Sequence, residues 1–348
     1  MKQIEELFTL ALELKASDIH LSVGSPPMFR INGDLNSLDM DNLTPNDTAD
    51  YVKKILNDRE YEEYSREGES DSSYELTGVG RFRVNVFKKR GNDALVLRTI
   101  NVKVPTLEVL GMPEVISKLT DKTRGLILVT GTTGSGKSTT LAAMINEINI
   151  KRKGHILTLE DPIEYLHENN KSLISQREIG KDTQSYAKAL RSALREDPDV
   201  ILIGEMRDYE TISIAITAAE TGHLVLSTLH TMGAVKTVDR IIGVFPSDQQ
   251  QQIRLQLASV LEGVISQQLI PDTNGGRVAA LEVMIANSAI RNLIREGKPH
   301  HIESSIQTGA RDGMMTMDSS IMNLYNKGTI SRDDALNCAI NKDTFSRI

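Results

Sequence analysis

The sequence predicts an α/β fold, in which a smaller α+β domain precedes a larger domain built on a mainly parallel sheet. Three observations lead to this prediction. Apolar runs alternate with helix-forming stretches between residues 125 and 235, and this alternation is typical of parallel strands covered by helices. Shorter strand-like segments with glycine-containing turns fill the first hundred residues. From about residue 280 onward the chain has the pattern of helices.

The first domain is expected over residues 1–101. Apolar side chains recur on one face of a helix in residues 4–14, and short strand-like segments separated by turns follow it. The expected strands are Ile19–Val23, Met28–Ile31, Tyr74–Leu76, Arg81–Phe87 and Ala94–Ile100. Pro105 and Gly111 lie in a linker expected over residues 102–114, which leads to the second domain.

The second domain is expected to have its core in residues 115–280 and a helical C-terminal part in residues 281–348. Its expected strands are nearly continuous apolar runs, as in parallel strands that are buried on both faces. These runs are Leu126–Thr130, His155–Glu160, Val200–Gly204 and Leu224–Leu229. Because ligands of such sheets bind at the carboxyl ends of the strands, residues that follow these runs are candidates for a functional site.

Composition excludes several classes of protein. A net charge of -7, no tryptophan and 4% aromatic residues argue against a dedicated nucleic-acid binder. The single Cys338 excludes an intrachain disulfide. No apolar stretch is long enough to cross a bilayer, and the N-terminus lacks the pattern of a signal peptide. We therefore expect a cytoplasmic protein that contacts a membrane only through partners.

Residues 131–138 read Gly-Thr-Thr-Gly-Ser-Gly-Lys-Ser, between an apolar run and a helix-forming stretch. This is the pattern of a Walker A phosphate-binding loop, in which glycines let backbone N–H groups turn toward the anion. Lys137 is expected at the β- and γ-phosphates, and Ser138 at Mg²⁺. The sequence thus predicts binding of a nucleoside triphosphate. The expected binding residues are Gly131, Thr132, Thr133, Gly134, Ser135, Gly136, Lys137, Ser138 and Thr139.

A second segment, Asp197–Asp208, contains a buried-strand pattern that ends in Gly204 and Glu205. A carboxylate just past such a strand can take the proton of a water that attacks the γ-phosphate, so Glu205 is the candidate catalytic base. Gly204 stands where a Walker B strand usually carries the aspartate that holds Mg²⁺. Metal binding must then depend on Ser138, the phosphates, water and a carboxylate from elsewhere. The alternative is an exposed acidic strand end.

Two further strand ends carry polar candidates. Glu160, Asp161 and Glu164 follow one apolar run, and they could converge on Mg²⁺ or, for Glu164, on the attacking water. A solvated acidic turn is the alternative. His230 closes another run and could donate to the γ-phosphate as a sensor of nucleotide state, although a histidine at a strand end is more often structural.

These segments, in this order, resemble those of the secretion-ATPase superfamily that powers type II secretion and type IV pili. Its Walker A loop, acidic box, atypical Walker B strand and histidine box are matched by GTTGSGKST, TLEDPIEY, DPDVILIGEMRD and TGHLVLSTLHT. The resemblance covers nearly the whole chain. It implies a hexamer in which a PAS-like N-terminal domain precedes a RecA-like ATPase domain that hydrolyses ATP with Mg²⁺.

The resemblance also implies that arginines of the N-terminal domain complete the site across a domain or subunit boundary. Arg83 and Arg98 match those positions, and Arg81 is a weaker candidate. Cations aimed at the phosphate oxygens stabilise the charge of the transition state. Judged from the spacing alone, Arg81 and Arg83 could equally be two solvated arginines on one face of an edge strand.

Within the superfamily, residues 289–296 (AIRNLIRE) look like a segment of the pilus retraction ATPases. Spacing alone favours a plain amphipathic helix with Ile290, Leu293 and Ile294 toward a core. The remaining polar side chains would then be exposed and available to transmit force or bind a partner. These are Arg291, Asn292 and Arg295.

The overall prediction is a hexameric Mg²⁺-ATP motor for pilus retraction and twitching motility. Expected partners are other copies of the chain, an inner-membrane pilus platform protein and an accessory retraction ATPase. The motor would lie at the inner face of the cytoplasmic membrane. Assembly and secretion ATPases typically carry a four-cysteine zinc module, which one cysteine cannot form.

Besides a pilus-assembly or type II secretion ATPase of the same superfamily, against which the missing zinc module argues, three alternatives stay open at this point. The accessory retraction ATPase shares the core motifs, and Leu281 stands where a histidine is expected in retraction ATPases. A regulatory protein that binds ATP but hydrolyses little of it is a second alternative. A RecA-like DNA motor is a third, which the acidic composition disfavours.

Overall fold

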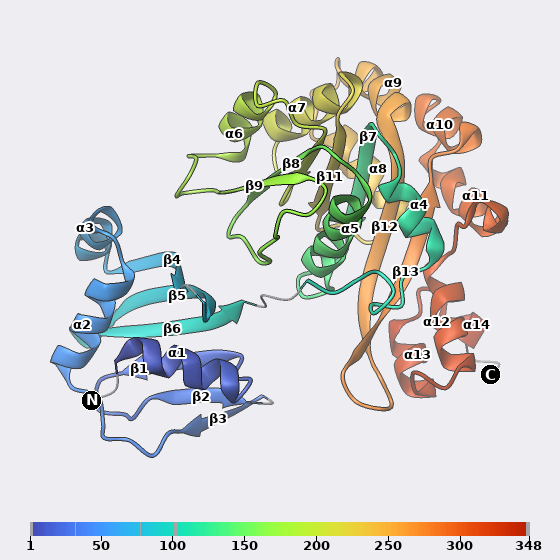
Figure 1. Cartoon of the computed structure of the whole chain (residues 1–348). Coiled ribbons are helices and arrows are strands. Elements are labelled where there is room, and N and C mark those ends of the chain that lie inside the picture. The colour runs from blue at the N-terminus through green and yellow to red at the C-terminus, as the bar shows by residue number, and fades with distance from the viewer. Residues whose placement is uncertain (1–2, 32, 77, 101–103, 346–348) are drawn as a thin grey trace. The chain divides into compact units, whose positions relative to one another are not determined.

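The computed structural model describes residues 3–31, 33–76, 78–100 and 104–345. The chain divides into two compact units, residues 1–103 and residues 104–348 (Figure 1). The domain boundary expected after residue 101, and the first two residues of the expected linker, fall among residues 101–103, which lie outside the described residues. Each unit is described by itself below.

The N-terminal unit is an antiparallel sheet with helices on one face. Its helices are α1 (Ile4–Glu13), α2 (Pro45–Ile55) and α3 (Asp58–Glu67). Its strands are β1 (Asp18–Ser22), β2 (Met28–Ile31), β3 (Asp34–Ser37), β4 (Glu69–Leu76), β5 (Gly80–Lys89) and β6 (Asn92–Ile100). They form a six-stranded sheet in the order β3-β2-β1-β6-β5-β4. Each of the five expected strand segments overlaps one of these strands.

Alternation of apolar and polar residues explains how this sheet packs. In β5, Phe82, Val84 and Val86 are buried, and they join apolar side chains of α1 and α2 in one cluster. The residues between them, including Arg83, point to the opposite face. The sheet therefore has one apolar face under the helices and one polar face that carries arginines.

The second unit contains a seven-stranded sheet in the order β13-β12-β7-β11-β10-β8-β9. Its strands are β7 (Gly125–Thr130), β8 (His155–Glu160), β9 (Leu173–Glu178), β10 (Val200–Ile203), β11 (Leu224–Leu229), β12 (Leu261–Pro271) and β13 (Arg277–Ile285). All neighbouring pairs are parallel except the β12–β13 hairpin. The carboxyl ends of β7, β8, β10 and β11 therefore lie at one edge of the sheet.

Helices cover both faces of this sheet (Figure 1). Those before the hairpin are α4 (Glu114–Thr120), α5 (Lys137–Lys151), α6 (Tyr186–Ala193), α7 (Tyr209–Glu220), α8 (Ala234–Gly243) and α9 (Gln250–Val260). Those after it are α10 (Ser288–Arg295), α11 (Ile302–Thr308), α12 (Met317–Asn326), α13 (Arg332–Cys338) and α14 (Lys342–Phe345). Alternate residues of β10 join two different apolar clusters, Ile201 in one and Leu202 in the other. This two-sided burial explains the continuous apolar runs in the sequence.

The boundary expected between residues 280 and 281 was wrong in its position, because it falls inside β13. The helical part begins only at α10.

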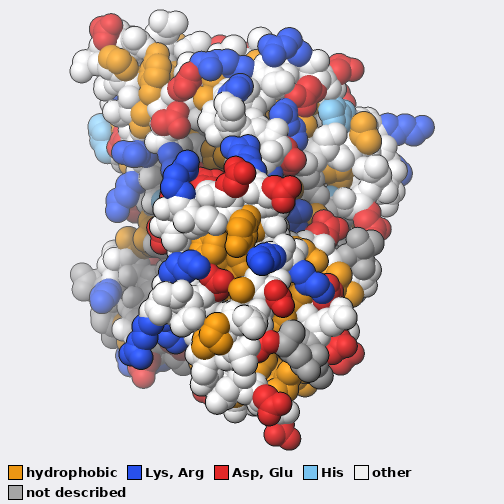
Figure 2. Space-filling model, turned by 90° about the vertical axis from the view of Figure 1, so that its left-hand side faces the viewer, with side chains coloured by type: hydrophobic (Ala, Val, Ile, Leu, Met, Phe, Trp, Pro, Cys, Tyr) orange, Lys and Arg blue, Asp and Glu red, His pale blue; other side chains and the backbone are white. Residues whose placement is uncertain are grey.

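Among the described residues, no helix combines the length and apolar composition that crossing a bilayer requires. Over the face of the molecule in Figure 2, acidic and basic side chains lie side by side.

Candidate nucleotide-binding site

The candidate residues of four strand ends line one cavity of about 200 Å³ in the second unit. The loop after β7 contributes Thr133, Gly134, Lys137 and Ser138 to its wall. The other strand ends contribute their polar candidates, which are Glu160, Asp161, Glu164, Glu205 and His230. Residues that are up to about a hundred positions apart in the sequence therefore meet at the carboxyl edge of the sheet, as parallel-strand topology predicts.

The loop between β7 and α5 is tightly bound to the neighbouring strand β12. Gly131 has φ of +144°, and a Cβ there would overlap the carbonyl oxygen of Gln267. A Cβ at Gly136 would lie 2.7 Å from the side-chain nitrogen of Gln267. Thr140, one turn into α5, donates a hydrogen bond of 2.8 Å to the Oε1 atom of Gln267. Gln267, which belongs to no motif of the sequence, thus packs against the loop and helps to hold its conformation.

Lys137 is almost fully buried, and its Nζ atom donates to the carbonyl oxygens of Gly131 at 2.9 Å and Thr132 at 3.0 Å. Burial lowers the pKa of Lys137, while the charges of Glu205 and Glu164 act in the opposite direction. Ser135 Oγ is buried and has no hydrogen-bond partner within the described parts of the chain. A loop that holds a desolvated ammonium and an unbonded hydroxyl fits a phosphate ligand, which supplies acceptor oxygens.

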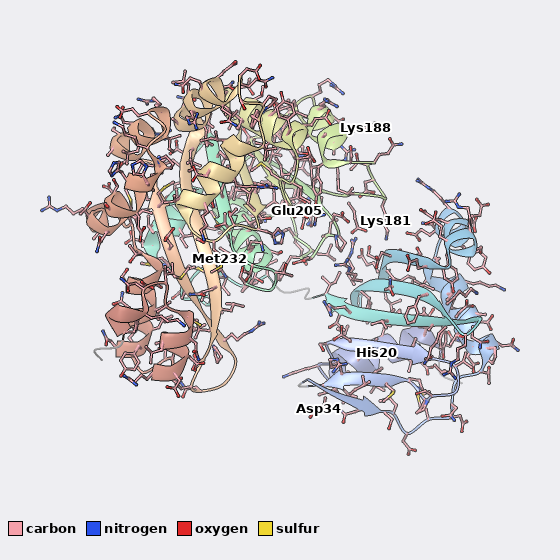
Figure 3. The ribbon with its side chains drawn as sticks, turned by 180° about the vertical axis from the view of Figure 1, so that it is seen from behind. His20, Asp34, Lys181, Lys188, Glu205 and Met232 are labelled. Atoms are coloured by element: carbon pink, nitrogen blue, oxygen red, sulfur yellow. The ribbon has the colours of Figure 1, made fainter. Side chains whose placement is uncertain are left out.

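Glu205, which Figure 3 labels, follows the end of β10, and its carboxylate lies close to Arg207 and His230. His230 Nε2 lies 3.2 Å from Glu205 Oε2, and Arg207 forms an ion pair with Glu205 Oε1. The His230 contact lacks hydrogen-bond geometry, so Oε2 is a buried acceptor without a hydrogen bond among the described residues. Such an atom can accept the proton of a water molecule in the cavity.

Gly204 occupies its position for a steric reason. A Cβ at this residue would lie 2.7 Å from the hydroxyl oxygen of Tyr186 and 3.3 Å from the carbonyl oxygen of Leu159. The backbone N–H of Gly204 donates to that same Leu159 oxygen at 2.8 Å. Tyr186, which belongs to α6 and lines the cavity, therefore fills the space that the aspartate of a common Walker B strand would need.

The acidic residues after β8 differ in their surroundings. Glu160 accepts hydrogen bonds from Thr158 at 2.6 Å and Gln176 at 3.2 Å, and burial raises its pKa to about 7. Asp161 and Glu164 are exposed at the cavity. In the part of the chain that the structure describes, no three His, Cys, Asp or Glu side chains form a group that could hold a metal ion. The acids thus form no complete metal site of their own. Their oxygen atoms suit Mg²⁺, which usually keeps several water ligands and binds proteins through one or two carboxylates together with the phosphates of a substrate.

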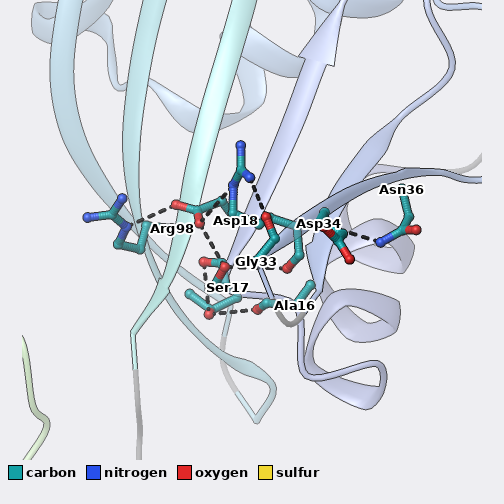
Figure 4. Close-up of polar contacts among 9 residues, drawn as sticks. Ala16, Ser17, Asp18, Gly33, Asp34, Asn36 and Arg98 are labelled. Carbon is teal, nitrogen blue, oxygen red and sulfur yellow. Dashed lines mark hydrogen bonds and ion pairs between the residues drawn. The ribbon is translucent and has the colours of Figure 1, made fainter. Parts of the chain in front are cut away.

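The arginine candidates lie in the N-terminal unit, so their part in this site stays a prediction. Arg83 on β5 and Arg98 on β6 are direct cross-strand neighbours, and both are exposed. Arg98 Nε donates to Asp18 Oδ1 at 2.9 Å, as Figure 4 shows. Arg81 is largely buried and donates to Ser73 Oγ at 2.8 Å, which binds it within its own sheet.

Helix α10 carries the AIRNLIRE segment, and one expectation about it was wrong. Arg291 is not an exposed residue, because its guanidinium donates to the carbonyl oxygens of Ala258 and Ser259 at 2.8 Å. It also pairs with Glu262 at 2.7 Å. These carbonyls end helix α9, so Arg291 caps that helix and attaches α10 to it. Asn292 and Arg295 are exposed, as expected.

Sequence reasoning missed four residues of this site: Gln267, Tyr186, Arg207 and Tyr165. Tyr165 shares a hydrogen bond of 2.9 Å with Thr139. Arg207 could have been found, because it lies two residues after Glu205 in the same segment. Tyr165 could have been found as well, because it follows Glu164 in the TLEDPIEY segment. Gln267 and Tyr186 give no local signal, since each acts on a residue of another element.

The chain is similar to known proteins over most of its length. A family model described as "Type II/IV secretion system protein" matches residues 1–276. The chain is 51% identical to a type IV pilus retraction ATPase, PilT, of Pseudomonas aeruginosa, over 95% of this chain and 96% of the relative. It is 39% identical to the type IV pilus ATPase PilU of the same organism, over 96% and 88%.

The structure also resembles a solved one. A crystal structure of the pilus retraction motor PilT with bound ADP superposes with a TM-score of 0.94 at 47% identity, covering 100% of both chains. The α/β fold class predicted from the sequence is thereby confirmed.

Proposed function

The chain belongs to the type II/IV secretion system protein family, and from this premise we propose that it is the ATP-hydrolysing motor that drives retraction of type IV pili. The observation that carries the proposal is the buried, unbonded Oε2 atom of Glu205, which faces the same cavity as Lys137 and Ser138. That arrangement combines a phosphate-binding loop with a group able to activate water.

The residues divide the chemistry among them. Lys137 binds phosphate oxygens, and Glu205 orients the attacking water and accepts its proton. Arg207 and His230 hold the carboxylate of Glu205 in place from its two sides. Ser138 would hold Mg²⁺, with Glu160, Asp161 and Glu164 reaching it through water. When bound, Mg²⁺ neutralises charge on the phosphate oxygens.

The motor acts as a homohexamer at the inner face of the cytoplasmic membrane. It engages an inner-membrane pilus platform protein and works with an accessory retraction ATPase. Arg83 and Arg98 complete the phosphate site of a neighbouring domain or subunit, which links the state of the nucleotide to the position of the N-terminal unit. Support for this role is the exposure of both guanidiniums on a polar sheet face.

Removing either exposed arginine should lower kcat more than it weakens nucleotide binding. Because two residues share the role, each of Arg83→Ala and Arg98→Ala should reduce kcat by roughly 10²-fold, below the effect of a single arginine finger. Steady-state phosphate release and nucleotide affinity are measured on the same preparations. The matched control is Arg90→Ala, which changes an exposed arginine of the β5–β6 turn. Unchanged kcat in both test variants would refute the role.

The accessory ATPase is the second candidate, because it shares the fold and the core motifs. The identity of 51% to the retraction ATPase, against 39% to PilU, favours the main proposal. Restoration of retraction in cells that lack their own retraction motor decides between them, because an accessory ATPase alone should not restore it. A low-turnover regulatory protein is distinguished by measuring steady-state phosphate release.

The exposed residues of α10 test the motor function separately from hydrolysis. Asn292→Ala combined with Arg295→Ala should leave ATP hydrolysis unchanged but abolish retraction, so that cells keep their pili and lose twitching. Both side chains are exposed, and among the described residues the Asn292 side chain bonds only to Glu296 at the end of α10, so the fold should be retained. Normal retraction by this variant would remove the functional role of the segment.

Arg291→Ala serves as the contrasting variant in that experiment. Losing its charge-assisted bonds to α9 and Glu262 should lower the free energy of unfolding by about 1.5–3 kcal/mol. Hydrolysis should fall only to the extent that the protein unfolds. Thermal unfolding and phosphate release, measured together, separate this structural effect from the effect of the exposed pair.

A further inference from the structure

A single row of side chains crosses the polar face of the N-terminal sheet. In the strand register, Arg30 on β2 is opposite Asp18 on β1, Asp18 is opposite Arg98 on β6, and Arg98 is opposite Arg83 on β5. Like charges directly opposite each other destabilise a sheet. The row carries three guanidiniums and one carboxylate, so its Arg98–Arg83 end keeps an excess of positive charge, which an anion would neutralise.

Asp18 is the one acid of this row, and it is largely buried between the arginines (Figure 4). Its Oδ1 atom accepts the hydrogen bond from Arg98 Nε, and its Oδ2 atom accepts one of 2.8 Å from Ser17 Oγ. Arg30 Nε lies 4.0 Å away on the other side. Burial raises the pKa of Asp18, but the bonds from Ser17 and Arg98 outweigh it and lower the pKa below its ordinary value. The carboxylate is therefore ionised at neutral pH and held from several directions.

The contact with Asp18 leaves the outer edge of the Arg98 guanidinium available. Only Nε is engaged, the side chain remains 70% exposed, and the described residues supply no protein partner for the two terminal Nη groups. That edge presents two parallel donors, which suit two oxygens of one phosphate. Arg83 differs, because none of the described residues forms a hydrogen bond or ion pair with its guanidinium, so its long side chain is not held in one orientation.

We propose that Asp18 is a positioning residue that fixes Arg98 with its two terminal Nη groups directed toward the phosphate oxygens of the nucleotide. The proposal rests on the role of Arg98 in the proposed function and deepens it. A guanidinium that is already oriented loses less conformational entropy when it binds, so the arginine contributes more to the transition state. Arg98 then acts as the fixed donor of the pair, and Arg83 as the adaptable one.

The test is a double-mutant cycle on the full-length, assembled protein. Asp18→Asn should lower kcat roughly tenfold, the fold-change that loss of one charge-assisted hydrogen bond produces, with KM for ATP little changed. The same change should lower kcat equally in an Arg83→Ala background. It should have no further effect in an Arg98→Ala background, because there is no guanidinium left to position.

Two variants control for effects on the fold. Asp93→Asn removes another partly buried carboxylate of the same sheet, one that accepts from Lys88 and Tyr64 away from the row. It should lower the unfolding temperature without lowering kcat. Ser17→Ala changes an exposed residue and removes the bonds of its hydroxyl to Asp18 Oδ2 and, at 3.3 Å, to the carbonyl oxygen of Arg30. It should fold normally and show a smaller decrease of kcat than Asp18→Asn, because the bond from Arg98 to Asp18 remains.

The outcomes separate the two proposals. If Arg98→Ala leaves kcat unchanged, the role of Arg98 itself is wrong. If Arg98→Ala lowers kcat but Asp18→Asn does not, or if Asp18→Asn lowers kcat equally in the Arg98→Ala background, Asp18 does not position Arg98, and the proposed function stands without it.

Discussion

Lys137→Ala should abolish measurable ATP hydrolysis, with a loss in kcat of roughly 10³-fold or more. The Nζ atom is the ammonium of the phosphate loop, and removing a cation that faces the transferring phosphoryl group removes stabilisation that water cannot replace. In the structure this atom bonds only to carbonyl oxygens of its own loop among the described residues, at Gly131 and Thr132. No core contact depends on its charge, so the fold should persist.

Phosphate release and thermal unfolding of this variant are compared with those of Lys151→Ala. Lys151 lies at the other end of the same helix and pairs with Glu147 and Asp121 on the surface. That control should retain hydrolysis. Near-normal phosphate release by Lys137→Ala would contradict the assignment of the whole cavity as the nucleotide site.

Glu205→Gln should retain ATP binding but reduce kcat by roughly 10³-fold, within the range expected for loss of a general base. The amide preserves the shape of the side chain and an acceptor oxygen for Arg207, but it cannot take a proton from water. Binding is followed with a fluorescent nucleotide and turnover by phosphate release. The control is Glu210→Gln, an exposed acid in the first turn of α7 that pairs with Arg191.

A parallel loss of binding and turnover in Glu205→Gln would mean that Glu205 is structural. In that case its ion pair with Arg207 and its contact with His230 would serve to hold the strand ends together, and the catalytic base would have to be sought elsewhere at the cavity. Glu164, which is exposed at the same cavity, is the first candidate for that role.

The parts of the fold that could be predicted are those with a strong local signal. Strands β7, β8, β10 and β11 are continuous apolar runs, and the glycine loop lies between a strand and a helix. The sequence therefore predicted that these strands exist and that their carboxyl ends lie at the edge of the sheet where the site is. Helices α2 and α3 were not predicted, although Thr44 with Asp47 and Asn57 with Glu60 form capping boxes at their starts. The polar composition of α3 hid it from a search for apolar periodicity, whereas α2 carries Tyr51, Val52 and Ile55 at helical spacing and could have been found.

The parts that could not be predicted depend on contacts between distant residues. The β12–β13 hairpin contains Gln267, whose burial under the phosphate loop explains a polar residue inside an apolar strand. Arg291 has the spacing of an exposed helical residue, but its guanidinium reaches carbonyls 32 and 33 residues earlier in the chain. Helical periodicity gives the direction of a side chain and not the neighbour that it meets.

The contact between Gly204 and Tyr186 limits the order in which this strand end can change during evolution. An aspartate introduced at position 204 would collide with the tyrosine hydroxyl, because even its Cβ would lie 2.7 Å from that oxygen. The substitution requires the Tyr186 side chain to shift or to be replaced by a smaller one, and that replacement by itself opens a void in the wall of the cavity. The two changes therefore depend on each other. This epistasis can keep a lineage on the glycine form of the strand, so that its carboxylate chemistry stays with Glu205.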